Sequence, residues 1–175
     1  MLNRDSTMPV THVNRKDDTY YLHAGTTKTG KPRYWFSKST EGDLIEAIPE
    51  GYEIYENPDA QVFLRKIVPQ LVTPAEVAVV TKGLERYAPG QYCIVDVQGD
   101  HIVVYHSRRG GLYQKMLRFT LDDEKDRTFR VQRWCFKGSI DGWIDLWMSG
   151  GFGQLPGLVQ MFCPHLGRDS FYEQM

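Results

Sequence analysis

Long apolar segments are missing from this sequence of 175 residues. No window approaches the roughly 18 consecutive apolar residues that mark a membrane-spanning helix. The first segment, MLNRDSTMPVTHVNRKDDT, also lacks the apolar run that follows the charged part of a secretory signal. We therefore expect a cytoplasmic protein that does not bind membranes.

Cysteine is scarce, and the common metal and phosphate motifs are absent. Cys93, Cys135 and Cys163 stand at wide spacing, which indicates neither a disulfide framework nor a zinc site of paired cysteines. The sequence contains no HExxH motif, and GGFG at 150–153 lacks the lysine of a P-loop. We predict no metal and no cofactor.

Neither sign of charge is in large excess, since 21 Lys and Arg residues face 22 Asp and Glu residues. The charged fraction of 25% and the hydrophobic fraction of 41% are typical of a folded globular protein. The signs are segregated locally: residues 24–40 contain four cations and no acid, whereas residues 41–59 contain seven acids and no base. Neighbouring blocks of opposite charge can neutralise each other within the fold, which weakens the case for an external polyanion.

Two short segments near the start of the chain, TYYLHA at 19–24 and RYWFS at 33–37, are rich in aromatic residues. The segment between them, GTTKTGKP, supplies glycine and proline for a turn, so the pattern predicts a β-hairpin with a long tip. Alternation along the second strand puts Tyr34 and Phe36 on one face and Trp35 on the other.

The acidic segment that follows gives weaker signals. DLIEAI at 43–48 predicts a short helical turn that Pro49 ends, and QVFLRKI at 61–67 predicts a strand.

The strongest helix signal covers residues 73–87. Thr73, Pro74 and Glu76 have the spacing of a capping box with proline at the first helical position. Apolar residues then recur at helical spacing, so one face of this helix is expected to lie on a sheet. Gly83 would cost about 1 kcal/mol relative to alanine if it were exposed, which favours a position of close packing.

The sequence period changes to two after this helix. Turn-forming segments separate five strand candidates, QYCIVDV, HIVVYHS, LYQKMLRFTL, RTFRVQRWCF and WIDLW. Short connections imply antiparallel neighbours. We therefore predict an α+β fold: an N-terminal β-hairpin region followed by one capped helix and a five-stranded antiparallel meander, which strong twist would let close partly into a barrel.

These signals divide the chain into four regions. They are a flexible N-terminal arm at 1–17, a hairpin-containing region at 18–72, the helix with the meander at 73–148, and an ordered tail at 149–175. The alternative is that all four pack as one domain.

The hairpin tip is the first candidate binding site. Lys28, Lys31 and Arg33 surround Trp35, and cations beside a flat ring suit a phosphate backbone with stackable bases or an acidic protein. The alternative is that Trp35 covers a sheet edge while the lysines keep the turn soluble and prevent edge pairing.

A second basic region falls on the third and fourth strands of the meander. Arg118 and Arg130 become neighbours if the DDEKD turn pairs the strands, and alternation places Trp134 on the face of Arg130. This region could extend the first one, or it could be a solvated face balanced by the acids of the turn.

A third candidate site is a cysteine nucleophile paired with a histidine. A two-residue loop at 99–100 would bring Cys93 opposite His106, with His101 at the end of the same hairpin. A loop longer by one residue would separate them, because a slip of one residue reverses every side chain. The valines on the shared face argue for an inert, buried thiol.

We expect a non-enzymatic binding or adaptor protein that uses a basic and aromatic sheet surface. A protein partner or self-association is favoured over nucleic acid. Two alternatives stay open: a nucleic-acid-binding protein that uses the same surface, and a small hydrolase or transferase that depends on cysteine and histidine.

Overall fold

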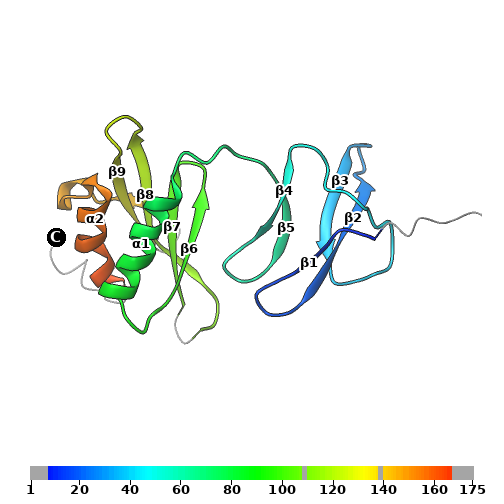
Figure 1. The fold of residues 1–175 in the computed structure, drawn as a ribbon, viewed down its shortest axis with the longest axis horizontal. Helices are drawn as coiled ribbons and strands as arrows, with labels where there is room; N and C mark the ends of the chain where they lie inside the picture. The colour runs from blue at the N-terminus through cyan, green and yellow to red at the C-terminus, as the bar shows by residue number, and fades with distance from the viewer. Residues whose placement is uncertain (1–7, 108–109, 138–139, 167–175) are drawn as a thin grey trace, which may run out of the picture. The chain divides into compact units, whose positions relative to one another are not determined.

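The computed structural model describes residues 8–107, 110–137 and 140–166 (Figure 1). Its contacts divide the chain into two compact units, which we call unit 1 (Met1–Ile67) and unit 2 (Val68–Met175). Each unit has its own sheets, and each is described here by itself. The α+β fold predicted from the sequence is confirmed, with the N-terminal hairpin preceding the helix and the meander.

Unit 1 consists of a three-stranded antiparallel sheet and a separate hairpin. The strands are β1 (Thr11–Val13), β2 (Thr19–Thr26) and β3 (Pro32–Ser37) in the sheet, and β4 (Tyr52–Glu56) and β5 (Val62–Lys66) in the hairpin. Leu22 of β2 is wholly buried, and the ring of Tyr34 meets that of Tyr52 edge to face at 6.0 Å. The small core of unit 1 therefore lies between the sheet and the hairpin.

Two segments of unit 1 differ from the sequence prediction. The helical turn predicted at 43–48 is wrong, because this segment runs along β2: Leu44 forms an isolated bridge with His23, and Ile45 N donates to the Leu22 carbonyl at 3.1 Å. The short strand β1 lies within the range expected to be a flexible arm. Both segments supply hydrogen-bond partners to the edge of β2, a demand that only the folded sheet creates.

Helix α1 (Pro74–Tyr87) opens unit 2 with the predicted capping box. Thr73 Oγ1 accepts a hydrogen bond from Glu76 N, and Glu76 Oε2 accepts one from Thr73 N at 2.8 Å. Arg127 adds an ion pair to the same carboxylate at 2.6 Å. The start of α1 is thereby fixed to the turn between two strands of the sheet.

The sheet of unit 2 is the predicted antiparallel meander with one additional strand. Its strands are β6 (Tyr92–Gln98), β7 (His101–Ser107), β8 (Gln114–Asp123), β9 (Thr128–Lys137) and β10 (Ile140–Asp145), in the order β10-β9-β8-β7-β6. Strand β11 (Phe152–Gln154) pairs with the first half of β9, and β10 pairs with the second half. The described strands form open sheets and no closed barrel.

Two helices cover one face of this sheet (Figure 1). Helix α2 (Leu155–Phe162) lies against α1, and short 3-10 turns precede β11 and follow α2 at Trp147–Ser149 and Cys163–His165. The core beneath the helices includes the fully buried side chains of Phe119, Phe129 and Phe162.

Gly83 of α1 packs closely against Val159 of α2. A Cβ atom built on Gly83 would lie 2.0 Å from a methyl carbon of Val159, so the predicted close packing is confirmed. No helix within the described ranges combines the length and the apolar character that crossing a membrane would require.

Candidate binding surfaces

The tip of the β2–β3 hairpin is a defined turn. Thr27 N donates to the Lys31 carbonyl at 2.9 Å, and Lys31 N donates to Thr27 Oγ1 at 3.1 Å. Gly30 within the turn has a φ of +76°, a conformation that glycine adopts without steric cost. We use the name hairpin surface for Lys28, Lys31, Arg33 and Trp35, which are all exposed on this turn and on β3.

Trp35 is held in place by its neighbours. Its indole stacks on the imidazole of His23 with ring centroids 5.5 Å apart and planes 10° from parallel. His23 is only 3% exposed, and its Nε2 donates to the Ser39 carbonyl at 3.0 Å. Gly25 leaves room for the indole, since an added Cβ would lie 3.1 Å from the ring. The 37% of Trp35 that is exposed is therefore a fixed feature of the surface.

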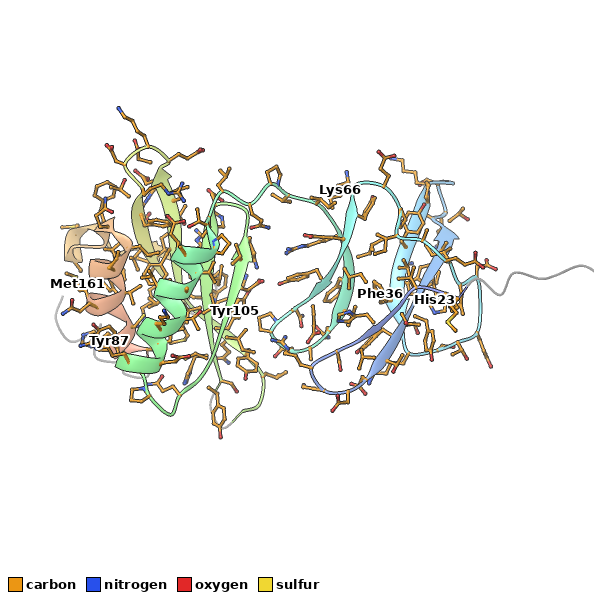
Figure 2. All side chains as sticks on the ribbon, viewed as in Figure 1. His23, Phe36, Lys66, Tyr87, Tyr105 and Met161 are labelled. Carbon is orange, nitrogen blue, oxygen red and sulfur yellow. The ribbon has the colours of Figure 1, made fainter. Side chains whose placement is uncertain are left out.

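Alternation along β3 matches the prediction from the sequence. Phe36 pairs with Leu22 on the face toward the core, whereas Trp35 pairs with His23 on the other face. Figure 2 labels His23 and Phe36, which lie on opposite faces of this sheet. The guanidinium carbon of Arg33 lies 5.5 Å from the centre of the Trp35 ring, so a cation and an indole act together at the exposed face.

The cations of the hairpin surface are not neutralised by the acidic segment that follows. Within the described residues, Lys28, Lys31 and Arg33 form no ion pair. Two acids of that segment have other partners: Glu53 pairs with Arg65 at 2.8 Å, and Glu56 pairs with Arg15 at 2.7 Å.

Hydrogen bonds within unit 1 hold the carboxylate of Glu56. Burial raises the pKa of Glu56, but hydrogen bonds from His12 and Arg15 outweigh that effect, so its pKa lies below the usual value. This carboxylate therefore stays charged and remains bonded to His12 and Arg15 within unit 1.

The second candidate lies on the face of the unit 2 sheet that the helices leave open. We use the name outer face for Lys115, Arg118, Arg130, Trp134 and Trp143. Arg118, Arg130 and Trp134 alternate with the core residues of β8 and β9, and a β-bulge in β8 brings Lys115 to the same face, over the Trp134 ring. The structure brings the three predicted members Arg118, Arg130 and Trp134 together there. Trp143 was not predicted: it stands opposite Trp134 and meets it edge to face at 5.2 Å.

The cations of the outer face already have partners within unit 2. Arg130 pairs with Asp122 at 2.5 Å, and Arg118 Nε donates to Gln132 Oε1 at 2.7 Å. Arg118 also lies 4.5 Å from the centre of the Trp143 ring.

Burial lowers the pKa of Arg118, and the charge of Arg130 adds to that effect. The arginines of the outer face therefore have partners within unit 2, unlike the cations of the hairpin surface. Because the two surfaces belong to different units, their fusion into one continuous surface stays a prediction.

The cysteine and histidine candidates are only partly brought together. The two-residue loop puts Cys93 opposite His106, as the shorter loop predicted, whereas His101 pairs with Gln98 on the other face of the sheet. Burial raises the pKa of the Cys93 thiol, which is the opposite of what a nucleophilic cysteine needs. Burial also lowers the pKa of His101.

Metal ligands are not assembled in the part of the chain that the structure describes, where no three His, Cys, Asp or Glu side chains cluster. Comparisons with protein-family models, with curated proteins and with solved structures found no match. The function is therefore inferred from the surfaces alone.

Proposed function

We propose that this chain is a non-enzymatic binding or adaptor protein whose hairpin surface docks an acidic segment of a protein partner. One observation supports this most directly. Lys28, Lys31 and Arg33 are exposed and without an ion-pair partner among the described residues, and Arg33 lies over an indole that His23 holds in a fixed orientation. Carboxylates of a partner would pair with these cations, and the indole would supply a rigid apolar contact.

The neighbours of Trp35 favour a protein partner over nucleic acid. A base that stacked on the indole would compete with the Arg33 guanidinium and with the His23 ring for the faces of Trp35. A carboxylate can pair with Arg33 while the guanidinium stays over the ring. A second copy of the chain belongs to this partner class, because it carries a set of exposed acids that form no ion pair within the described residues: Glu41, Asp43, Glu46 and Glu50.

The test compares a glutamate-rich peptide with a mixed single-stranded oligonucleotide, each titrated against the full chain at low and at physiological salt. Lys28→Ala, Lys31→Ala and Arg33→Ala are each expected to weaken peptide binding about 3- to 10-fold, which corresponds to roughly 0.7–1.4 kcal/mol. Lys66→Ala is the matched control, since Lys66 is an exposed lysine of unit 1 outside the hairpin surface.

The proposal would be overturned if all four variants bound the glutamate-rich peptide as tightly as the unchanged chain does. Tighter binding of the oligonucleotide, with an affinity that falls steeply as salt rises, would establish the nucleic-acid alternative instead. Sedimentation of the free chain at the same two salt concentrations tests self-association.

A further inference from the structure

Strand β6 (Tyr92–Gln98) has an unpaired edge. It stands at the end of the unit 2 sheet, and among the described strands it pairs with β7 alone. In an antiparallel strand every second residue directs its N–H and C=O groups away from its neighbour. The outer edge of β6 therefore offers a row of backbone donors and acceptors that matches another extended strand.

A groove runs beside this edge, between α1 and β6. Its volume is about 570 Å³, and its walls include Val77, Thr81 and Leu84 from α1, Ala88 at the C-cap of that helix, and Cys93 and Val95 from β6. The helix residues recur at spacings of about three to four and so form one stripe along α1. Because Cys93 and Val95 are consecutive members of the same strand face, an added strand would point its alternate side chains toward the same groove.

Two polar groups in the groove favour a peptide over a purely apolar ligand. Gln91 Oε1 is buried and accepts no hydrogen bond from the described residues, so it needs a donor such as an amide N–H. Glu85 is the charged member of the lining, and it is exposed without an ion pair in the described part of the chain. A basic side chain on the ligand would complement it.

We propose that β6 and this groove bind an extended peptide segment of a partner protein by strand addition. The peptide backbone pairs with the free edge of β6, an apolar side chain enters the groove between Val77 and Val95, and a basic residue lies near Glu85. The site belongs to unit 2 and prefers a basic strand, whereas the hairpin surface belongs to unit 1 and prefers an acidic one. The two sites would serve an adaptor that holds two different segments.

The experiment selects linear peptides from a displayed random library on the full-length chain and then maps the best synthetic peptide. Amide hydrogen exchange is expected to show new protection along Tyr92–Gln98 when the peptide binds. N-methylation of the peptide amides that face β6 should abolish binding, whereas methylation of the alternate amides should be tolerated, because only the former donate to the strand edge.

A matched pair of variants locates the site independently. Thr81 lines the groove and is exposed, so Thr81→Trp fills the groove without entering the core; binding should fall about tenfold or more, as expected when a large side chain occupies the space. Lys82→Trp places the same indole on the adjacent exposed position of α1 and should leave binding unchanged. Glu85→Gln should weaken peptides that carry a basic residue.

Several results would overturn the proposal. Failure to enrich any peptide would do so, and so would peptides that are insensitive to Thr81→Trp or that protect amides outside β6. Protection of β6 in the free chain that grows with protein concentration would show that a second copy occupies the edge instead. None of these outcomes depends on the hairpin surface, so the two proposals fail separately.

Discussion

Burial sets the chemistry of the two cysteines that line or adjoin the groove of unit 2. A thiol reacts as its thiolate, so a raised pKa suppresses reactivity near neutral pH. Burial raises the pKa of Cys93, and burial together with the nearby Cys93 raises the pKa of Cys163 to about 12. The position of Cys93 opposite His106 is therefore not sufficient for a nucleophilic pair.

We expect iodoacetamide to label Cys93 and Cys163 slowly at neutral pH, and Cys93 faster than Cys163. Cys93 lines the groove, whereas Cys163 is 0% exposed. The labelling rate should increase as the pH rises toward the raised pKa of each thiol, since the thiolate fraction grows. Mass spectrometry of the labelled peptides gives both rates. Rapid labelling of Cys93 at neutral pH, lost in His106→Ala, would instead support the cysteine- and histidine-dependent hydrolase or transferase.

At the scale of elements, the contact between α1 and α2 depends on one missing side chain. Gly83 has no Cβ, and Val159 of α2 fills the space that a Cβ would take. Alanine has the better intrinsic helix propensity by about 1 kcal/mol, so propensity and packing oppose each other at this position. The distance of 2.0 Å to a Val159 methyl carbon decides in favour of packing, because an atom cannot be accommodated there without displacing Val159.

Gly83→Ala is expected to lower the free energy of unfolding by about 1–3 kcal/mol, the usual cost of overpacking, although it improves helix propensity. Urea unfolding followed by circular dichroism measures the change. Gly157→Ala is the matched control, because Gly157 lies in α2 with open space around its Cα and should be neutral or stabilising. Val159→Ala removes the clashing methyl groups but also buried apolar contacts, so the double variant Gly83→Ala/Val159→Ala should lose less stability than the sum of the two single losses. A stabilised Gly83→Ala variant would contradict the packing of these helices.

At the scale of the whole molecule, each unit contains a carboxylate that joins segments distant in the sequence. Glu56 joins β4 to the segment around Arg15 in unit 1, and Glu76 joins the start of α1 to Arg127 in unit 2. Burial raises the pKa of Glu76, but hydrogen bonds from Arg127 and Thr73 outweigh it and lower the net pKa. A carboxylate whose pKa is lower in the folded state stabilises the fold when charged.

Both carboxylates should therefore make the chain acid-sensitive. Their contributions are fully present above the unfolded pKa of 4.5 and are lost as the pH falls through the lower folded values. Glu76→Gln keeps a side chain that suits the capping box but removes the ion pair, so it should cost about 0.5–1.5 kcal/mol at neutral pH.

Urea unfolding at several pH values measures the acid sensitivity, and both Glu56→Gln and Glu76→Gln should flatten the dependence. An unchanged dependence in both variants would show that other groups control acid unfolding.

The elements that depend on local forces could be predicted from the amino-acid pattern alone. Period-two alternation identified the strands of the meander, and turn residues fixed their antiparallel order. The capping box fixed the start of α1, since Thr73 and Glu76 satisfy each other's backbone N–H groups within one turn of helix. Alternation also assigned Arg118, Arg130 and Trp134 to one face, because it needs no knowledge of distant segments.

The folded structure was needed to show which groups have partners. The pairing of Glu56 with Arg15 joins residues far apart in the sequence, as does the bridge between Leu44 and His23. The strand order that leaves β6 paired with β7 alone among the described strands also follows only from the assembled sheet. The local sequence pattern shows which hydrogen bonds and ion pairs each side chain can form. Whether a group forms them within the protein depends on the distant segments that folding brings into contact with it.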